Sequence, residues 1–545
     1  SSKEQPVLRL YKIISEMRIY WQIMNKKVTK ENNMSKIEVP SKKIETSKIS
    51  AKSIVKCDLP VATGRKSMFD TKKMGMDLRP PMRLNINIGA GFNLLSPEII
   101  IGARGEYIVN GGLPNSFTIS GGGNTFKSTL LEFMMLSAMN KIMSTADSFK
   151  QKYDTENNIS LNELERFTEQ FEYLPSGMLL GSNPRWTVTN KATVFAGEWL
   201  NSIRKEMMAK AEDKDMQVEF TAFIDYRTGK PLVLPVPIFT DVDSLSELEG
   251  EGSVSMIEDK GIDESATMFL QQGGLKTKLL STLAMLSLKT NTYFGLTAQA
   301  GKNSSPETMQ DKYTPPPKNS TYISGNTKIK GVSDKFFFLP LLSLFVKKSF
   351  PLVHPTTKLP EYPLHNEAEM KTDLHVLDIV PYRNKTGSSG DVLKVVVSQK
   401  DGVIPELTDF YNCKENKFGL EGTNLSYSFV IYPDVKMQRG TVRRKLKDDK
   451  KLARAAEITY ELLQSKYIRY VIDNKLWCEP EELYKDLIEL GYDWDTILET
   501  RGWWAPDNYA PYLPNPLSII DILWMRKGKI PFWYDKSKIK KVEVA

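Results

Sequence analysis

The amino-acid sequence predicts an α/β protein in which a mostly parallel, twisted sheet is flanked by helices. Two observations carry this prediction. Between residues 85 and 300, short apolar runs rich in β-forming residues alternate with segments whose apolar residues recur at helical spacing, which is the pattern of a wound parallel sheet. A glycine-rich turn, "SGGGNTFKSTL" at 120–130, also stands between a run typical of a strand and a run typical of a helix.

Three regions are expected along the 545 residues. Residues 1–84 begin with an amphipathic helical pattern at 7–24 and continue as an arm rich in Lys, Ser and Thr, which we interpret as a basic extension used in oligomerisation. Residues 85–435 form the predicted α/β core. Residues 436–545 are predicted to be a helical region that ends in an aromatic, basic tail.

Positive charge is concentrated in two places although the formal net charge is only +8. Residues 1–66 hold 15 Lys and Arg against 6 Asp and Glu, and residues 438–454 hold 8 against 2. Such patches suit a polyanionic partner, but a solvated surface explains them equally well. The longest apolar run, 336–346, contains a proline and is shorter than the roughly 18 residues of a membrane span, so no membrane partner is expected.

The elements of the core follow from its hydrophobic pattern. The runs "RLNINIGAGFNL", "EIIIGARGEYIV" and "NSFTIS" predict short strands, and "KSTLLEFMMLSAMNKIM" at 127–143 predicts a helix. Further helices are predicted at 192–212, 264–289 and within 450–500, and strands at 231–245 and 291–299. The segment 300–333 is rich in Pro, Ser, Asn and Gly, so we expect a long functional or disordered loop.

The turn at 120–130 is close to the phosphate-loop pattern G-x-x-x-x-G-K-[ST]. Gly121, Lys127 and Ser128 fit it, and Phe126 stands where the second glycine belongs. In such a loop backbone N–H groups surround phosphate oxygens, the lysine neutralises the β- and γ-phosphates, and the hydroxyl binds Mg²⁺. The predicted ATP-binding residues are Gly121, Gly122, Gly123, Asn124, Thr125, Phe126, Lys127, Ser128 and Thr129. A strand–turn–helix with an incidental lysine remains the alternative.

Three further segments fit an ATPase site. The strand ending "IFTDVDSL" has the form of a Walker B strand and predicts Asp243, with Asp241 as second choice, beside Mg²⁺. "YDTENN" provides Glu156 as a carboxylate that polarises the attacking water, or else a solvated acidic turn. Gln299 ends a strand directly before the long polar loop, where it would sense the γ-phosphate or be an ordinary polar strand end.

The order of these segments resembles the core of RecA-type recombinases, and the loop with Phe before Lys127 is similar to that of the UvsX-type recombinases of phages. The resemblance spans roughly residues 85–425. It implies a RecA-like ATPase with Glu156 as the catalytic glutamate, Asp243 and Ser244 in the Walker B segment, and Gln299 as the allosteric glutamine. It further implies ATP and Mg²⁺ as cofactors, and a location in the cytoplasm of a bacterial host if a phage encodes the chain.

Two cations in "PYRNKTGSSG", Arg383 and Lys385, project from the same side of a predicted strand. A similar pair in RecA-like filaments reaches the γ-phosphate of the neighbouring subunit, and hexameric helicases use a comparable segment for the same purpose. The resemblance therefore implies that Arg383 and Lys385 act catalytically in trans. An exposed basic hairpin is the alternative.

The function implied is that of a DNA-dependent ATPase that polymerises on single-stranded DNA and promotes pairing and strand exchange with double-stranded DNA. Its expected partners are DNA, further copies of the chain in a helical filament, and single-strand-binding and mediator proteins. The residues expected to contact DNA lie in the loop at 301–333: Lys302, Lys312, Tyr313, Lys318, Tyr322, Lys328 and Lys330. A hexameric helicase ring and a non-enzymatic scaffold with a degenerate ATPase fold remain as alternatives.

Overall fold

The computed structural model describes residues 81–545 apart from 97, 144–147, 158–159, 191–193, 249–264, 303–326, 333–334, 365–370, 424, 468–474, 507–512 and 540–545. The chain divides into two compact units, 1–76 and 77–545, and every described residue belongs to the second. The predicted helix at 7–24 and the basic arm lie outside the described residues. Among the helices that the structure describes, none has the length and apolar character needed to cross a membrane.

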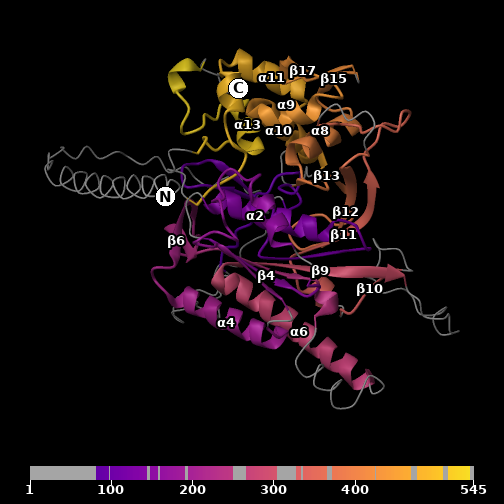
Figure 1. The fold of residues 1–545 in the computed structure, drawn as a ribbon. Helices are drawn as coiled ribbons and strands as arrows, with labels where there is room; N and C mark the ends of the chain where they lie inside the picture. Colours follow the sequence, from indigo (N-terminus) through magenta and orange to yellow (C-terminus); the bar gives the residue numbers. More distant parts are fainter. Residues whose placement is uncertain are drawn as a thin grey trace, which may run out of the picture. The chain divides into compact units, whose positions relative to one another are not determined.

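Ten strands in the described part of the chain form one large mixed sheet (Figure 1). In spatial order they are β14 (Gly402–Val403), β13 (Leu393–Ser398), β12 (Leu374–Asn384), β11 (Leu342–Pro351), β3 (Ser116–Gly121), β9 (Thr292–Lys302), β8 (Ile238–Asp243), β4 (Phe149–Asp154) and β5 (Trp186–Asn190), with β10 (Thr327–Ile329) paired to β9. The six strands from β11 to β5 are parallel, so their carboxyl ends meet at one edge. Strands β10, β12, β13 and β14 pair antiparallel.

Helices cover both faces of this sheet, so the expected α/β class is confirmed. In Figure 1, α2 (Lys127–Met143) lies on one side of the sheet, and α4 (Ala196–Glu212) and α6 (Ser265–Thr290) lie on the other. Two hydrophobic clusters correspond to these layers, because one includes Leu131, Met134 and Met135 of α2 and the other includes Trp199 of α4 and Leu283 of α6. All five side chains are buried, as expected of strands and helices that share a core.

The remaining elements surround this core. They are β1 (Glu98–Ile101), β2 (Tyr107–Asn110), α3 (Leu161–Thr168), β6 (Gln217–Ile224), β7 (Pro231–Pro235), η1 (Leu245–Glu247), α7 (Lys335–Phe338), α8 (Pro405–Glu415), β15 (Leu420–Thr423), β16 (Ser426–Phe429), β17 (Tyr432–Met437), α9 (Val442–Asp448), α10 (Lys450–Tyr467), α11 (Pro480–Glu489), α12 (Trp494–Leu498), α13 (Ile519–Met525) and η4 (Lys536–Lys538). The expected division at residue 435 falls within β17, and the unit 77–545 spans it.

Two expected strands differ from those observed. The run 231–245 is two strands, β7 and β8, because the prolines on either side of Val236 lack the N–H groups that would continue one ladder. The run "RLNINIGAGFNL" contains no strand; Ile86 alone makes an isolated bridge, to Leu113. Its asparagines bond elsewhere instead: the Asn85 side chain donates to the Asn110 carbonyl at 2.8 Å.

Candidate active site

The glycine-rich turn connects β3 to α2, as the sequence predicts, and Lys127 is the first residue of the helix. The Lys127 ammonium donates to the Gly122 carbonyl at 2.5 Å, and the Thr125 hydroxyl donates to the same oxygen at 2.9 Å. Burial lowers the pKa of Lys127, and the negative charges of Asp243 and Glu156 oppose that shift. The lysine therefore lies within the field of both predicted acidic site residues.

Phe126 adopts a backbone conformation that normally belongs to glycine. Its φ is +58°, in the left-handed region, which costs a residue with a Cβ about 1–2 kcal/mol. Its half-buried ring packs against the main core and lies 5.0 Å, centroid to centroid, from the ring of His375 on β12. Phe126 thus keeps the backbone conformation of the glycine that it replaces in the pattern, and its ring adds a contact with His375.

Replacing Phe126 separates these two effects. We expect Phe126→Gly to retain nucleotide binding, because the phosphate contacts of such a loop come from backbone amides. Phe126→Ala loses the same ring but keeps a Cβ at positive φ, so it should be less stable than the glycine variant by about 1 kcal/mol. Urea unfolding and titration with a fluorescent ATP analogue measure both quantities. Loss of nucleotide binding in Phe126→Gly would show instead that the ring shapes the loop.

Asp243 lies at the carboxyl end of β8, close to the start of α2. The Thr297 hydroxyl donates to its Oδ1 at 2.5 Å, the Lys152 ammonium lies 3.2 Å from its Oδ2, and the Ser128 hydroxyl also bonds to the carboxylate. Burial alone would raise the pKa of Asp243, but Lys152 and these hydroxyl groups hold it below its usual value. The carboxylate is therefore a fixed anion beside Ser128.

The donor set fits magnesium. Mg²⁺ prefers hard oxygen ligands and is usually bound by one or two carboxylates together with substrate phosphates and waters. The Asp243 carboxylate and the Ser128 hydroxyl offer such oxygens side by side, and the buried Ser244 hydroxyl has no hydrogen-bond partner among the described residues. Within the described ranges no group of three or more His, Cys, Asp or Glu side chains could hold a metal.

Glu156 follows β4, the strand next to β8, and its side chain is exposed. The backbone N–H of Glu156 donates to Asp154 Oδ1 at 3.0 Å. Thr155 links this turn to the end of β8, because its N–H donates to the Asp243 carbonyl at 2.9 Å and its hydroxyl donates to the Ser244 carbonyl at 2.8 Å. The turn that bears Glu156 is therefore fixed to the end of β8.

Gln299 does not end its strand as expected, because β9 continues through Lys302, where it pairs with β10. β9 lies between β3 and β8, and the main chain of Gln299 pairs with Gly121. A Cβ at Gly123 would lie 3.9 Å from Gln299 Nε2, so the amide faces the loop. Gln299 N–H donates to the Ser246 hydroxyl at 2.9 Å, and that hydroxyl donates to the Lys330 carbonyl at 3.0 Å. Ser246 thus connects the segment after β8 to β9 and to the residue that follows β10.

Arg383 and Lys385 lie away from the phosphate loop of their own chain. On β11, Ser343 pairs with Arg383 and with Thr118, whereas Val346 pairs with Gly121. Lys385 is exposed and donates to the Leu339 carbonyl at 2.8 Å, and the Arg383 guanidinium stacks 5.1 Å from the Phe338 ring centroid. Arg383 Nε has no hydrogen-bond partner among the described residues.

Only some of the residues predicted to contact DNA are among those that the structure describes. Lys312, Tyr313, Lys318 and Tyr322 lie outside the described residues. Lys302 ends β9 and Lys328 is in β10, and the two strands pair antiparallel. Lys330 follows β10 and is exposed.

Sequence reasoning missed a buried ionic cluster beneath the site. Lys150 and Lys152 of β4 are both buried, and they pair with Glu132 of α2 and with Asp241 of β8. The segment "DSFKQKYDTE" is more polar than a typical core strand, yet β4 lies between β5 and β8. The period-2 spacing of Lys150 and Lys152, matched by that of Asp241 and Asp243, was the available signal.

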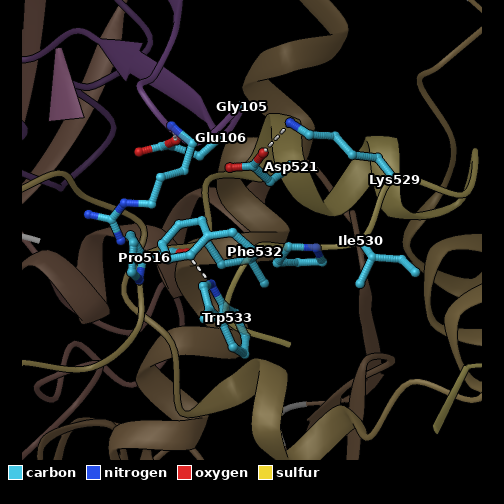
Figure 2. Close-up of a pocket in the computed structure, with 11 residues that line it drawn as sticks. Gly105, Glu106, Pro516, Asp521, Lys529, Ile530, Phe532 and Trp533 are labelled. Atoms are coloured by element: carbon cyan, nitrogen blue, oxygen red, sulfur yellow. Dashed lines mark hydrogen bonds and ion pairs between the residues drawn. The ribbon is translucent and has the colours of Figure 1, made fainter. Parts of the chain in front are cut away.

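A separate pocket lies between the turn after β1 and the segment around α13 (Figure 2). The Arg104 guanidinium stacks 4.3 Å from the Phe532 ring centroid there, and Lys529 pairs with Asp521 at 3.0 Å. Its volume of about 20 Å³ suffices for about one water molecule. A nucleotide does not fit it, and the phosphate loop does not line it.

Comparison with known proteins does not place this chain in a family. No protein-family model matches the chain, and no curated protein matches it either.

Proposed function

We propose that this chain is a DNA-dependent ATPase with a RecA-type core, which polymerises on single-stranded DNA and promotes homologous pairing and strand exchange. One observation carries the proposal. The glycine-rich turn follows β3, Asp243 ends β8, Glu156 follows β4, and Gln299 lies in β9 opposite Gly121. These four strands are adjacent and parallel, so the residues lie along one edge of the sheet. Ligands of open parallel sheets bind at this edge.

Each residue has a role in hydrolysis. The amides of the glycine-rich turn and Lys127 bind the phosphates, and Ser128 and Asp243 would hold Mg²⁺. The bound ion supplies neutralisation of phosphate charge. Glu156 orients the attacking water and accepts its proton, and Gln299 contacts the γ-phosphate from the neighbouring strand. Lys127 would leave the Gly122 carbonyl to bind phosphate, because a charged phosphate oxygen attracts the ammonium more strongly than that neutral oxygen does.

The position of Arg383 and Lys385 supports assembly of several copies of the chain into an oligomer. Gly121, the last residue of β3, is four positions along the strand from Phe117, the register partner of Leu342, which itself pairs with Asn384. At about 3.3 Å per residue this is roughly 13 Å of strand, so the backbone that carries the two cations lies well back along the sheet from their own glycine-rich turn. We infer that they act on nucleotide bound by a neighbouring subunit, as in a filament or a ring.

Ser246 is the proposed link between nucleotide and DNA. Ser246→Ala removes the hydroxyl that joins the Gln299 N–H to the Lys330 carbonyl. We expect basal hydrolysis to persist while stimulation by single-stranded DNA falls about 5-fold or more, the size of a typical coupling energy. ATPase assays with and without DNA measure the ratio, and Ser281→Ala, which removes an exposed hydroxyl on α6, is the matched control. Unchanged stimulation in Ser246→Ala would exclude this link.

Electron microscopy with strand-exchange assays tests the proposed function. With a non-hydrolysable ATP analogue and single-stranded DNA, a recombinase is expected to form open helical filaments and, with ATP, to exchange strands with homologous duplex. Closed rings with duplex unwinding would identify the hexameric helicase instead. Assembly without any nucleotide dependence would identify the scaffold.

A further inference from the structure

Five charged side chains form a buried network beneath the proposed nucleotide site. Lys150 and Lys152 project from one face of β4, Asp241 and Asp243 project from the same face of β8, and Glu132 reaches them from α2. The Lys150 ammonium lies 2.9 Å from Glu132 and 2.5 Å from Asp241. The Lys152 ammonium lies 2.7 Å from Glu132, 3.1 Å from Asp241 and 3.2 Å from Asp243.

Both lysines are almost completely excluded from solvent, at 0% and 1% exposure. Burying charged groups is unfavourable unless each is paired, and removing one partner leaves an uncompensated charge. The network has three carboxylates and two ammonium groups, so its ionised form carries one excess negative charge. An apolar strand in this position would avoid the free-energy cost of burying charged groups. The two lysines are therefore expected to have a specific role.

The two lysines differ in what they contact. Among the described residues, Lys150 forms ion pairs with Glu132 and Asp241, and its ammonium also lies 4.1 Å from the Trp186 ring centroid. Lys152 forms the same two ion pairs and in addition reaches Asp243. The Lys152 ammonium donates to Asp243 Oδ2, and the Thr297 hydroxyl donates to Asp243 Oδ1. Without Lys152, Asp243 would retain Thr297 and Ser128 but would face the negative charges of Asp241 and Glu132.

We propose that Lys152 is a positioning residue for magnesium, because it fixes the Asp243 carboxylate beside the Ser128 hydroxyl. Lys152 itself touches neither metal nor nucleotide; it acts through Asp243. Groups that orient a metal ligand in this way typically change metal affinity by about 10- to 100-fold when they are removed. This inference rests on the proposed function, since it requires that the site binds Mg²⁺ with ATP.

The test compares Lys152→Met with Lys150→Met. Both replace a buried lysine of the same network by an apolar side chain of similar length, but only the first removes a contact to Asp243. A fluorescent ATP analogue is titrated into the full chain in EDTA and at a series of Mg²⁺ concentrations. We expect Lys152→Met to require about 10- to 100-fold more Mg²⁺ for half-maximal enhancement of binding, with unchanged affinity in EDTA. Lys150→Met should keep the wild-type Mg²⁺ requirement.

Two further variants separate positioning from folding. Lys152→Arg keeps a cation beside Asp243 and should restore the Mg²⁺ requirement toward wild type. The double variant Glu132→Gln/Lys152→Met removes one charge of each sign, so the network keeps its net charge while Asp243 still lacks its partner. The double variant should fold even where the single one does not, as judged by thermal unfolding, and should still need more Mg²⁺.

The outcomes are distinct. A folded Lys152→Met or double variant with the wild-type Mg²⁺ requirement would overturn the inference, as would equal shifts in Lys150→Met and Lys152→Met. If no folded form of either Lys152→Met variant can be obtained, a wild-type Mg²⁺ requirement in Lys152→Arg supports the assignment and a loss of the Mg²⁺ effect there contradicts it. Failure of the wild-type chain to bind the analogue at all would instead contradict the proposed function.

Discussion

Replacing Arg383 and Lys385 together by alanine is expected to abolish ATP hydrolysis while nucleotide binding is retained. The two cations lie toward the amino end of β3, away from the phosphate loop of their own chain, so binding at that loop does not need them. A cation supplied in trans stabilises the charge of the transition state and contributes about 10³ to 10⁵ in rate. Steady-state ATPase assays and analogue binding measure the two effects, and Arg204→Ala/Lys205→Ala, an exposed pair on α4, is the control.

Mixing experiments identify the subunit on which the pair acts. When the Arg383/Lys385 double variant is mixed with Lys127→Ala, some interfaces join an intact phosphate loop to an intact cation pair. Activity should therefore reappear at intermediate ratios and vanish at both ends of the titration. A flat, inactive curve, with assembly verified by light scattering, would show that the pair does not act across an interface.

Lys127→Ala is expected to reduce ATP turnover by at least about 100-fold, the loss seen when one preorganised charge-stabilising group is removed. This side chain extends from the start of α2 into the glycine-rich turn, where it contacts the Gly122 carbonyl. The variant should stay folded, because the lysine makes no ion pair with a core residue that the structure describes. Turnover and the unfolding midpoint are measured beside Lys289→Ala, an exposed lysine at the end of α6. Wild-type turnover in Lys127→Ala would reject the phosphate-loop assignment.

The sequence predicts the parts of this fold that follow hydrophobic periodicity. The helix at 127–143 is found with the predicted limits, and those at 192–212 and 264–289 differ by a few residues from α4 and α6. Their patterns are periodic over several turns, which is where such prediction is strongest. Over 83–94 the pattern predicts a strand, but buried asparagine side chains take the place of a regular ladder there. Such pairings depend on residues distant in the chain, so no local pattern reveals them.

The candidate site also contains some residues that the sequence predicts and others that it does not. Lys127, Ser128, Asp243 and Gln299 could be singled out because each belongs to a short motif within or directly after a predicted strand. The residues that orient these side chains could not be predicted. Lys152 looks like a solvent-exposed residue in sequence, and only the pairing of β4 with β8 brings it to Asp243. Period-2 spacing does put Thr297 on the same side of β9 as Gln299, but nothing local directs it to Asp243.

The central claim is that this edge of the sheet binds and hydrolyses ATP in response to DNA. The measurement that tests it most directly is steady-state ATP turnover by the full chain at saturating Mg²⁺ and ATP, with and without single-stranded DNA. The account predicts turnover that rises when DNA is added and that increases more steeply than linearly with protein concentration, because each site is completed by a neighbour. Nucleotide binding without turnover, in the presence and absence of DNA alike, would contradict it.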